Sequence, residues 1–284
     1  MQRGSGKRGR DGERINRIDG GNTILWQVGR CAMPFYDDVR AEVLRHGAIH
    51  NSFLTRFRAG DVSGEEFHGF AVQFYSFARF FPRILAAQLV NTEDEAVADE
   101  LTRVLYSELG DGLVKNRHEL LYRRFLCSIG ISIHDAMMTP MRASTRAYID
   151  GMEGLYGSRN HATALGASFG LENMAITMWD QLIPGLSIIR TTRYPHMDMT
   201  YFTFHRQLES EHEKAMALAM AAVDGTGSVS QAGMTDLEKR EFRLGMNAVL
   251  DYLQGFWMGL EREPAGAMQG WTGPVPQLPS EWRG

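Results

Sequence analysis

The 284-residue sequence predicts an all-α fold. Apolar residues recur at spacings of three and four over most of the chain, which is the pattern of amphipathic helices. Alternating runs rich in β-branched residues, which indicate strands, are scarce. Neither an internal repeat nor a linker divides the periodic region. We therefore expect seven helices in one domain that spans residues 23–262.

The first helices are predicted from apolar spacing and from capping residues. One helix is expected at residues 36–57 and a second at residues 64–90. The second carries a thick aromatic face, formed by Phe67, Phe70, Phe74, Phe77, Phe80 and Phe81. Residues 91–95 (Asn-Thr-Glu-Asp-Glu) are typical of a helix cap and open a third helix. That helix is interrupted at residues 110–112 (Gly-Asp-Gly), and helical periodicity resumes over residues 118–127.

Four further helices are expected at residues 140–156, 162–182, 197–223 and 235–260. The second of these four should stop before Pro184, because proline lacks the N–H group that a helix interior uses. A Gly- and Ser-rich loop at residues 224–233 separates the last two helices. Thr235 and Glu238 form a capping-box pattern at the start of the last helix.

The two ends of the chain differ from this periodic region. Residues 1–22 are rich in Gly and Arg with little apolar content, so we expect a disordered basic tail. A basic arm that contacts an anionic partner is the alternative. Residues 263–284 contain four of the nine prolines and are expected to form an extended tail on the surface.

The composition excludes several classes of function. The formal net charge is −4, so the chain lacks the basic footprint of a dedicated nucleic-acid binder. The two cysteines, Cys31 and Cys127, cannot build a disulfide framework or a Cys-rich metal site. Apolar runs stay below the roughly 18 residues that span a bilayer, and the first residues lack the apolar core of a secretory signal. We expect a soluble cytoplasmic protein that binds neither nucleic acid nor membrane.

Three residues that can bind a metal share one face of the helix expected at residues 197–223. At about 100° per residue, Glu209 and His212 lie only about 40° and 20° from His205 around the helix axis. Their sector also holds Tyr201, Leu208, Met216 and Ala219, and the opposite sector holds Arg206, Gln207, Ser210, Glu211, Glu213 and Lys214. The alternative is a solvated helix face with incidental histidines. The apolar company favours a buried set, which needs partners or a metal.

Glu108, His118 and Glu172 lie on apolar stripes of other predicted helices. Their neighbours at helical spacing include Leu101, Val104, Leu121, Phe125, Leu165 and Phe169. Each residue alone could be a hydrogen-bonded core residue. In an unbroken helix Glu108 and His118 would lie about 15 Å apart along the axis. They can share a site only if the chain breaks at residues 110–112, where the two glycines permit unusual backbone conformations.

The types of ligand indicate which metal this set would hold. Three imidazoles and three carboxylates without a thiolate suit iron or manganese better than structural zinc. Six ligands are too many for one metal that must also bind substrate, and they suit a pair inside a helical bundle. Three carboxylates against two ferrous ions leave about one positive charge. This balance favours an anionic substrate or a reduced oxygen species.

The ligand pattern resembles that of the haem-oxygenase-like diiron oxidases. In that family a Glu in a broken third helix is followed ten residues later by a His, then by a Glu on the fifth helix and a His-x3-Asp/Glu-x2-His motif. Glu108, His118, Glu172 and the set His205, Glu209 and His212 match it, and the resemblance covers residues 35–260. It implies a seven-helix haem-oxygenase-like bundle, two Fe(II) ions (with manganese an option), O2 as co-substrate and a third helix that orders on metal binding.

The resemblance implies one of two activities. One branch of the family abstracts hydrogen from amino acids or fatty acids, which leads to desaturation, cyclisation or C–C cleavage. The other oxygenates amine nitrogen, and its members tend to add a carboxylate ligand from an earlier helix. Neither Asp nor Glu occurs between Glu66 and Glu93, which favours hydrogen abstraction from a small amino-acid-like substrate in natural-product biosynthesis. Many relatives have Asp at the position of Glu209, so the role of this longer side chain is open.

Several further expectations concern substrate and partners. Arg79 and Arg83 are candidates for binding a substrate carboxylate, although solvated or helix-terminal arginines are the alternative. An external electron donor and a homodimer are compatible with the sequence. Two other readings stay open: a metal-free enzyme on the same fold, with Cys127 as its nearest thiol, and a non-enzymatic helical protein with a structural metal site.

Overall fold

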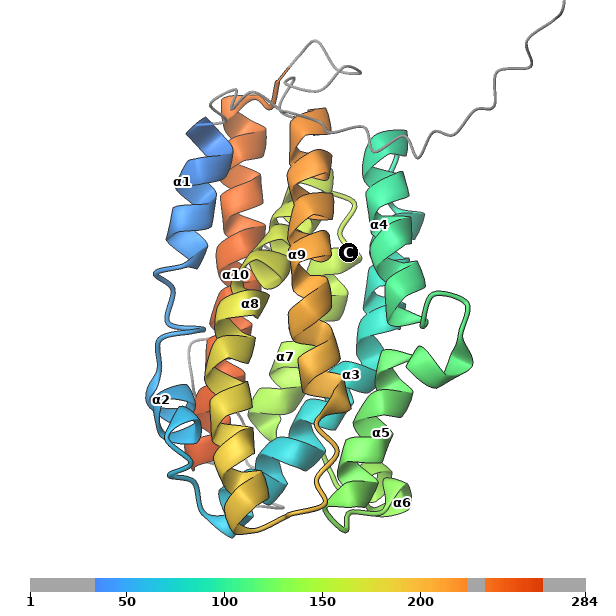
Figure 1. Ribbon diagram of the computed structural model, residues 1–284. Helices are drawn as coiled ribbons and strands as arrows, with labels where there is room; N and C mark the ends of the chain where they lie inside the picture. Colours follow the sequence, from blue (N-terminus) through green and yellow to red (C-terminus); the bar gives the residue numbers. More distant parts are fainter. Residues whose placement is uncertain (1–33, 224–232, 263–284) are drawn as a thin grey trace, which may run out of the picture. The chain divides into compact units, whose positions relative to one another are not determined.

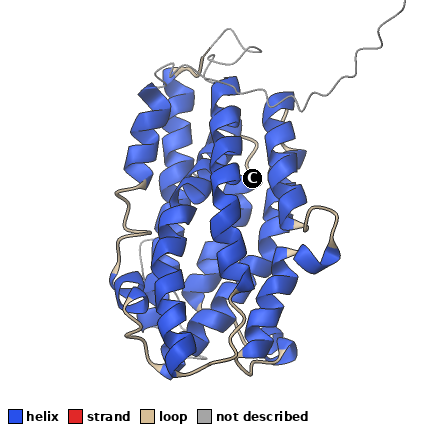
Figure 2. Ribbon diagram, in the orientation of Figure 1, coloured by secondary structure: helices blue, strands red, loops and turns tan. Residues whose placement is uncertain are grey.

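The computed structural model describes residues 34–223 and 233–262, and the regular structure in these ranges is helical throughout (Figures 1 and 2). The described helices are α1 (Pro34–Val43), α2 (Ser52–Arg58), α3 (Gly64–Val90), α4 (Glu95–Glu108), η1 (Val114–Asn116), α5 (His118–Ser128), α6 (Ile133–Met138), α7 (Ala143–Tyr156), α8 (His161–Thr192), α9 (Thr200–Val223) and α10 (Asp236–Arg262). The prediction of an all-α fold is therefore confirmed. The expected tails at residues 1–22 and 263–284 lie outside the described ranges.

The helix expected at residues 36–57 is wrong, because the chain leaves the helical path between α1 and α2. Asn51 causes the second start: its Oδ1 accepts a hydrogen bond from the Leu54 N–H (2.9 Å), and its Nδ2 donates to the Gly47 carbonyl (3.1 Å). Asparagine favours such caps over helix interiors. The short helix α6 was also missed, and it begins in the same way where Ser132 caps the Asp135 N–H (3.0 Å).

The expectation that a helix ends before Pro184 is also wrong, because α8 continues to Thr192. Proline removes one N–H donor from the helix, but the turns that follow bury Leu186 and Ile189 completely. Gly185 lies so close to α2 that an added Cβ would come within 1.9 Å of the Phe57 carbonyl oxygen. Tertiary packing therefore outweighs the local preference of the proline.

Helix α8 packs against α10, α9, α7 and α2 (Figure 1). Close approach of α8 and α10 depends on a reciprocal pair of glycines. A Cβ added to Gly166 would lie 2.0 Å from the Phe242 carbonyl oxygen, and one added to Gly245 would lie 2.0 Å from the Thr163 carbonyl oxygen. On the other side of α9, helix α4 packs against α9 and α3. These contacts bring α4, α5, α8 and α9 together.

The helix α3 matches its predicted bounds. A capping box starts it, in which Ser63 Oγ accepts from the Glu66 N–H (3.0 Å) and Glu66 Oε2 accepts from the Ser63 N–H (2.8 Å). Of the predicted aromatic face, Phe67, Phe70, Phe74 and Phe81 are buried, and Phe77 and Phe80 are partly buried. This face forms one wall of the interior that holds the predicted metal ligands.

Candidate metal centre

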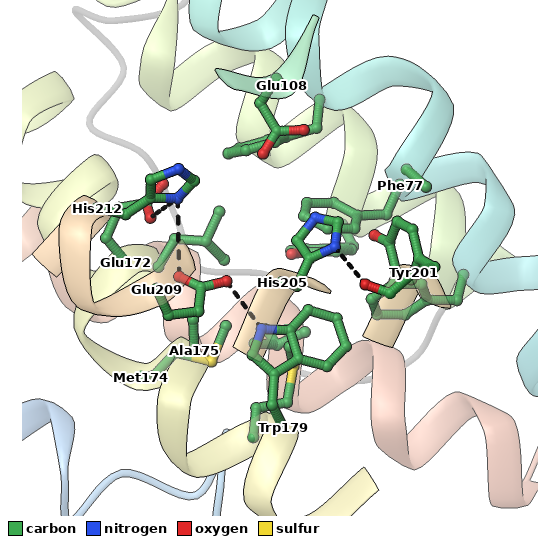
Figure 3. A pocket seen from close by; sticks show the side chains of 17 residues that line it. Phe77, Glu108, Glu172, Met174, Ala175, Trp179, Tyr201, His205, Glu209 and His212 are labelled. Carbon is green, nitrogen blue, oxygen red and sulfur yellow. Dashed lines mark hydrogen bonds and ion pairs between the residues drawn. The ribbon is translucent and has the colours of Figure 1, made fainter. Parts of the chain in front are cut away.

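All six predicted ligands are buried, and the structure brings them together in two groups. Glu108, His118 and His205 form the first group, and Glu172, Glu209 and His212 form the second. Within each group one ligand atom per residue lies within 4.8 Å of the others. Figure 3 shows Glu108, Glu172, His205, Glu209 and His212 pointing toward a common space. The sequence predicted this set, but it did not predict how the set divides.

A tight loop between α4 and α5 allows Glu108 and His118 to meet. Glu108 is the last residue of α4, and His118 is the first residue of α5. Between them Gly110, Asp111 and Gly112 have φ values of 92°, 51° and 79°, in the left-handed region that favours glycine. A Cβ at Gly110 would lie 2.5 Å from the Leu113 carbonyl oxygen. The loop thus has the backbone conformation that the sequence-based hypothesis required.

The first group combines two imidazoles and one carboxylate. His118 Nδ1 lies 2.8 Å from Glu108 Oε2, and the rings of His118 and His205 have centroids 4.2 Å apart. His205 Nδ1 lies 2.8 Å from the Tyr201 carbonyl oxygen, so a Nδ1–H would donate there and leave Nε2 as the metal-binding atom. The other ring nitrogen of His118, Nε2, has no hydrogen-bond partner among the described residues. A buried nitrogen without a partner fits a metal ligand.

The second group combines two carboxylates and one imidazole. His212 Nδ1 lies 3.3 Å from Glu172 Oε2 and 3.8 Å from Glu209 Oε2. Trp179 Nε1 donates a hydrogen bond to Glu209 Oε1 over 2.8 Å (Figure 3), which leaves Glu209 Oε2 without a hydrogen-bond partner among the described residues. On its far edge His212 Nε2 lies 3.4 Å from Ser107 Oγ. One possible metal-binding atom of each of the three side chains thus lies close to those of the other two.

Trp179 and Ser107 are supporting residues that sequence reasoning missed. Trp179 lies seven residues after Glu172, on the same stripe of α8, but its residue type gave only an apolar signal. Ser107 directly precedes Glu108 and carries no motif of its own. Both act by hydrogen bonds to ligand side chains, and such bonds fix the orientation of a metal ligand.

Burial and mutual charge shift the pKa values of these groups in opposite directions. Burial opposes ionisation of Glu108, but the imidazoles of His118, His205 and His212 outweigh it and lower its pKa to about 2. Burial, followed by the neighbouring His118, lowers the pKa of His205 to about 3. His205 is thus neutral near pH 7, the form in which imidazole binds a metal.

In the second group the pKa values of both Glu209 and His212 are raised. Burial and the adjacent charge of Glu172 raise the pKa of Glu209 to about 8. Burial opposes the charged form of His212, but its hydrogen bond to Glu172 and the nearby carboxylates raise its pKa to about 10. The closely spaced carboxylates therefore favour the protonated forms of Glu209 and His212. A bound cation would take the place of those protons.

A small apolar cavity adjoins both groups. Its volume is about 40 Å³, on a scale where roughly 10–15 Å³ holds one water molecule. The non-ligand side chains that line it are aromatic or aliphatic, namely Phe74, Phe77, Ala78, Phe81, Tyr148, Leu171, Met174, Ala175, Met178, Trp179, Tyr201 and Leu253. Concave, mostly apolar sites with a few convergent polar groups are typical of small-molecule sites. The donor set, its unsatisfied atoms and this cavity fit a centre that holds iron.

The predicted substrate-binding arginines do not join this site. Arg79 and Arg83 are exposed, and neither is among the residues that line the cavity. The guanidinium of Arg79 lies 5.1 Å from the ring centroid of Phe80, on the outer side of α3. The two arginines are one turn apart on α3 and therefore share one face of the helix, which is exposed. Phe74, Ala78 and Phe81 lie on the buried face.

Comparison with known proteins agrees with this geometry. The sequence pattern of the iron-containing redox enzyme family matches residues 68–236, a range that includes all six candidate ligands. None of the curated proteins matches.

Within the described part of the chain, no helix is both long and apolar enough to cross a membrane.

Solved structures of similar fold have low sequence identity. They include a CADD-like protein of unknown function from Nostoc punctiforme, with a TM-score of 0.64, 18% identity and coverage of 81% of this chain and 97% of that one. A domain with a heme oxygenase-like fold from Shewanella denitrificans has a TM-score of 0.59, 16% identity and coverage of 80% and 89%. A protein described as a TenA-like thiaminase from Sulfolobus solfataricus has a TM-score of 0.56, 14% identity and coverage of 82% and 96%. With its helical architecture and its sequence match, the chain has the haem-oxygenase-like fold and belongs to the iron-containing redox enzyme family.

Proposed function

We propose that the protein is an O2-activating non-haem diiron oxidase that removes hydrogen from an aliphatic carbon of a small amino-acid-like substrate. The observation that carries this proposal is the pair of adjacent buried groups, each with carboxylate and imidazole ligands, beside one apolar cavity. Membership of an iron-containing redox family supports iron as the metal. Glu108, His118 and His205 would hold one ion, and Glu172, Glu209 and His212 the other.

Iron bound here would supply electrons to O2 and so activate it for oxidation of the substrate. The chain's own residues position and protect that chemistry. Tyr201 fixes the ring of His205 through its backbone carbonyl, and Trp179 fixes the carboxylate of Glu209. The apolar walls exclude water, which limits side reactions of an oxidising centre.

The cavity also supports a statement about the substrate. The carboxylates and imidazoles that line it all belong to the candidate ligands, and its other side chains are aromatic or aliphatic. A substrate with an apolar body would pack there, with its polar head toward the ligand carboxylates and the metal ions. Among the described lining residues there is no Arg or Lys to hold a free carboxylate. We therefore propose that an amino-acid carboxylate or amine meets the metal centre directly, and that the side chain fills the cavity.

The alternatives are less well supported. An amine N-oxygenase would be expected to add a carboxylate ligand, but the carboxylates that line the cavity are Glu108, Glu172 and Glu209, which already serve in the two groups. A thiaminase-like enzyme would need a nucleophile in the pocket, and Cys127 is exposed instead. A purely structural metal site is normally closed, whereas an adjoining cavity leaves room for a substrate.

The proposal is tested by anaerobic Fe(II) titration followed by rapid mixing with O2, with and without a panel of amino acids and fatty acids. We expect about two irons per chain and O2 consumption that one class of apolar amino acid accelerates. His205→Ala should lose iron and O2 consumption, whereas His134→Ala, an exposed histidine on α6, should retain both. Iron uptake that equals that of the wild type in His205→Ala would contradict the proposal.

A further inference from the structure

A second cavity lies in the groove between α4 and α9, outside the metal centre. Its volume is about 340 Å³, compared with about 40 Å³ for the inner cavity. Charged side chains border it, namely Glu100, Arg103, Asp111, Glu211 and Lys214. Ser107 and His212 also line it, and His212 lines the inner cavity as well. The two cavities thus meet at a candidate ligand.

The imidazole of His212 separates the two spaces. Its Nδ1 edge faces the carboxylate of Glu172, 3.3 Å away on the inner side. Its Nε2 edge lies 3.4 Å from the hydroxyl of Ser107, which belongs to the wall of the outer cavity. Ser107 is a small side chain, 9% exposed, and it is the last residue before Glu108. The outer cavity thus reaches the metal centre at its second group of ligands.

One of the carboxylates that border the outer cavity, Glu100, has a buried oxygen without a partner. Arg103 pairs with Glu100 Oε1 at 2.6 Å, and Lys214 pairs with Glu211 Oε1 at 2.6 Å. Glu100 is only 7% exposed, and its second oxygen, Oε2, has no hydrogen-bond partner among the described residues. Burial raises the pKa of Glu100, although Arg103 opposes the rise. A buried carboxylate oxygen without a partner is costly unless a cation meets it.

The two cavities differ in the kind of molecule that can cross them. The inner cavity is lined mainly by aromatic and aliphatic side chains, and an ion that passed them would lose its hydration without compensation. The outer cavity offers carboxylates and a hydroxyl along its walls. Oxygen ligands of this type suit a divalent cation that is partly hydrated.

We propose that the outer cavity is the passage by which Fe²⁺ reaches the metal centre, and that Glu100 is its first buried ligand on the way. This inference rests on the proposed function, because a passage for iron presupposes an iron centre. The ion enters between α4 and α9, meets the carboxylate of Glu100 at the cavity wall and reaches the second group of ligands past Ser107. Organic substrate occupies the separate inner cavity, so the two approach from different sides.

The test is the rate of anaerobic Fe²⁺ uptake by the metal-free full-length chain, measured as iron protected from a fast ferrous chelator. Glu100→Gln should slow uptake several-fold and leave the final iron content unchanged. Arg103→Gln should speed uptake, because it frees the carboxylate of Glu100. The matched control is Asp99→Asn, which removes the same charge from the adjacent exposed position outside the cavity wall and should leave the rate near that of the wild type. Added salt should slow the wild type more than Glu100→Gln.

Equal uptake rates for the wild type and Glu100→Gln would overturn the proposal, as would equal slowing by Asp99→Asn. Circular dichroism and the final iron content would be measured for each variant to establish that it folds. A slower rate in a folded variant then does not arise from unfolded protein. Glu100-dependent loading without O2 consumption would support the passage and refute the oxidase. A wild-type chain that takes up no iron would refute both.

Discussion

The hydrogen bond from Trp179 is expected to set the affinity of the metal position at Glu172, Glu209 and His212. Trp179 Nε1 donates to Glu209 Oε1 over 2.8 Å, and the indole is 2% exposed. A hydrogen bond to a charged group contributes about 1.5–3 kcal/mol, and roughly 1.4 kcal/mol corresponds to a factor of ten in affinity. Trp179→Phe should therefore weaken binding of one metal ion by about 10- to 100-fold. The ion at the other group should bind nearly as before.

A second tryptophan provides the control for lost ring volume. Trp257 is 0% exposed, and its Nε1 has no hydrogen-bond partner among the described residues. Trp257→Phe should thus cost stability, on the order of 1–3 kcal/mol for a smaller buried ring, without a change in metal affinity. Anaerobic titration with Fe(II) or Co(II) should give two separated phases for Trp179→Phe and an unchanged curve for Trp257→Phe. Equal affinities in both variants would refute the role assigned to the Trp179 hydrogen bond.

Three further predictions concern the backbone and the pH response. Gly110→Ala should lower stability by about 1–3 kcal/mol, because φ is 92° there; iron titration should also show weaker binding at the first group, and an unchanged titration would contradict this. Gly166→Ala should lower the thermal midpoint, because its Cβ would lie 2.0 Å from the Phe242 carbonyl oxygen; scanning calorimetry measures this. Burial opposes ionisation of Glu66, but the Ser63 N–H and Arg56 lower its pKa. Glu66 thus stabilises the fold above its unfolded pKa of about 4.3, and this contribution is lost as the pH falls through the folded value. Urea unfolding at several pH values should show a shallower acid dependence in Glu66→Gln.

The burial and proximity of the six candidate ligands could be predicted from the sequence, because helical spacing shows which residues share a face. The helical period alone places His205, Glu209 and His212 on one face of a helix. The two glycines after Glu108 indicate the break in the helix before His118. The buried status of all six residues agrees with that reasoning. Their division into two groups could not be predicted, because it depends on how α4, α5, α8 and α9 pack and not on any one helix.

Each of the errors has a physical explanation. Pro184 was read from its local preference, but contacts of Gly185 with α2 and burial of Leu186 keep α8 intact beyond it. Arg79 is a candidate for binding a substrate carboxylate by sequence, but its side chain is exposed on α3. The hydrogen bond of Trp179 could not be predicted, because the sequence does not show which acceptor its indole N–H meets in the folded chain. For Pro184 and Trp179 a contact between distant segments decided the outcome, and for Arg79 the face of α3 on which it lies did.

The most direct test of the central claim is the position of the metal ions. Crystals of the protein loaded anaerobically with Fe(II) would be measured at the iron absorption edge for anomalous scattering. The account predicts two anomalous peaks per chain, one among Glu108, His118 and His205 and one among Glu172, Glu209 and His212. A single peak shared by both groups, or peaks away from these residues in crystals that contain iron, would contradict a diiron centre.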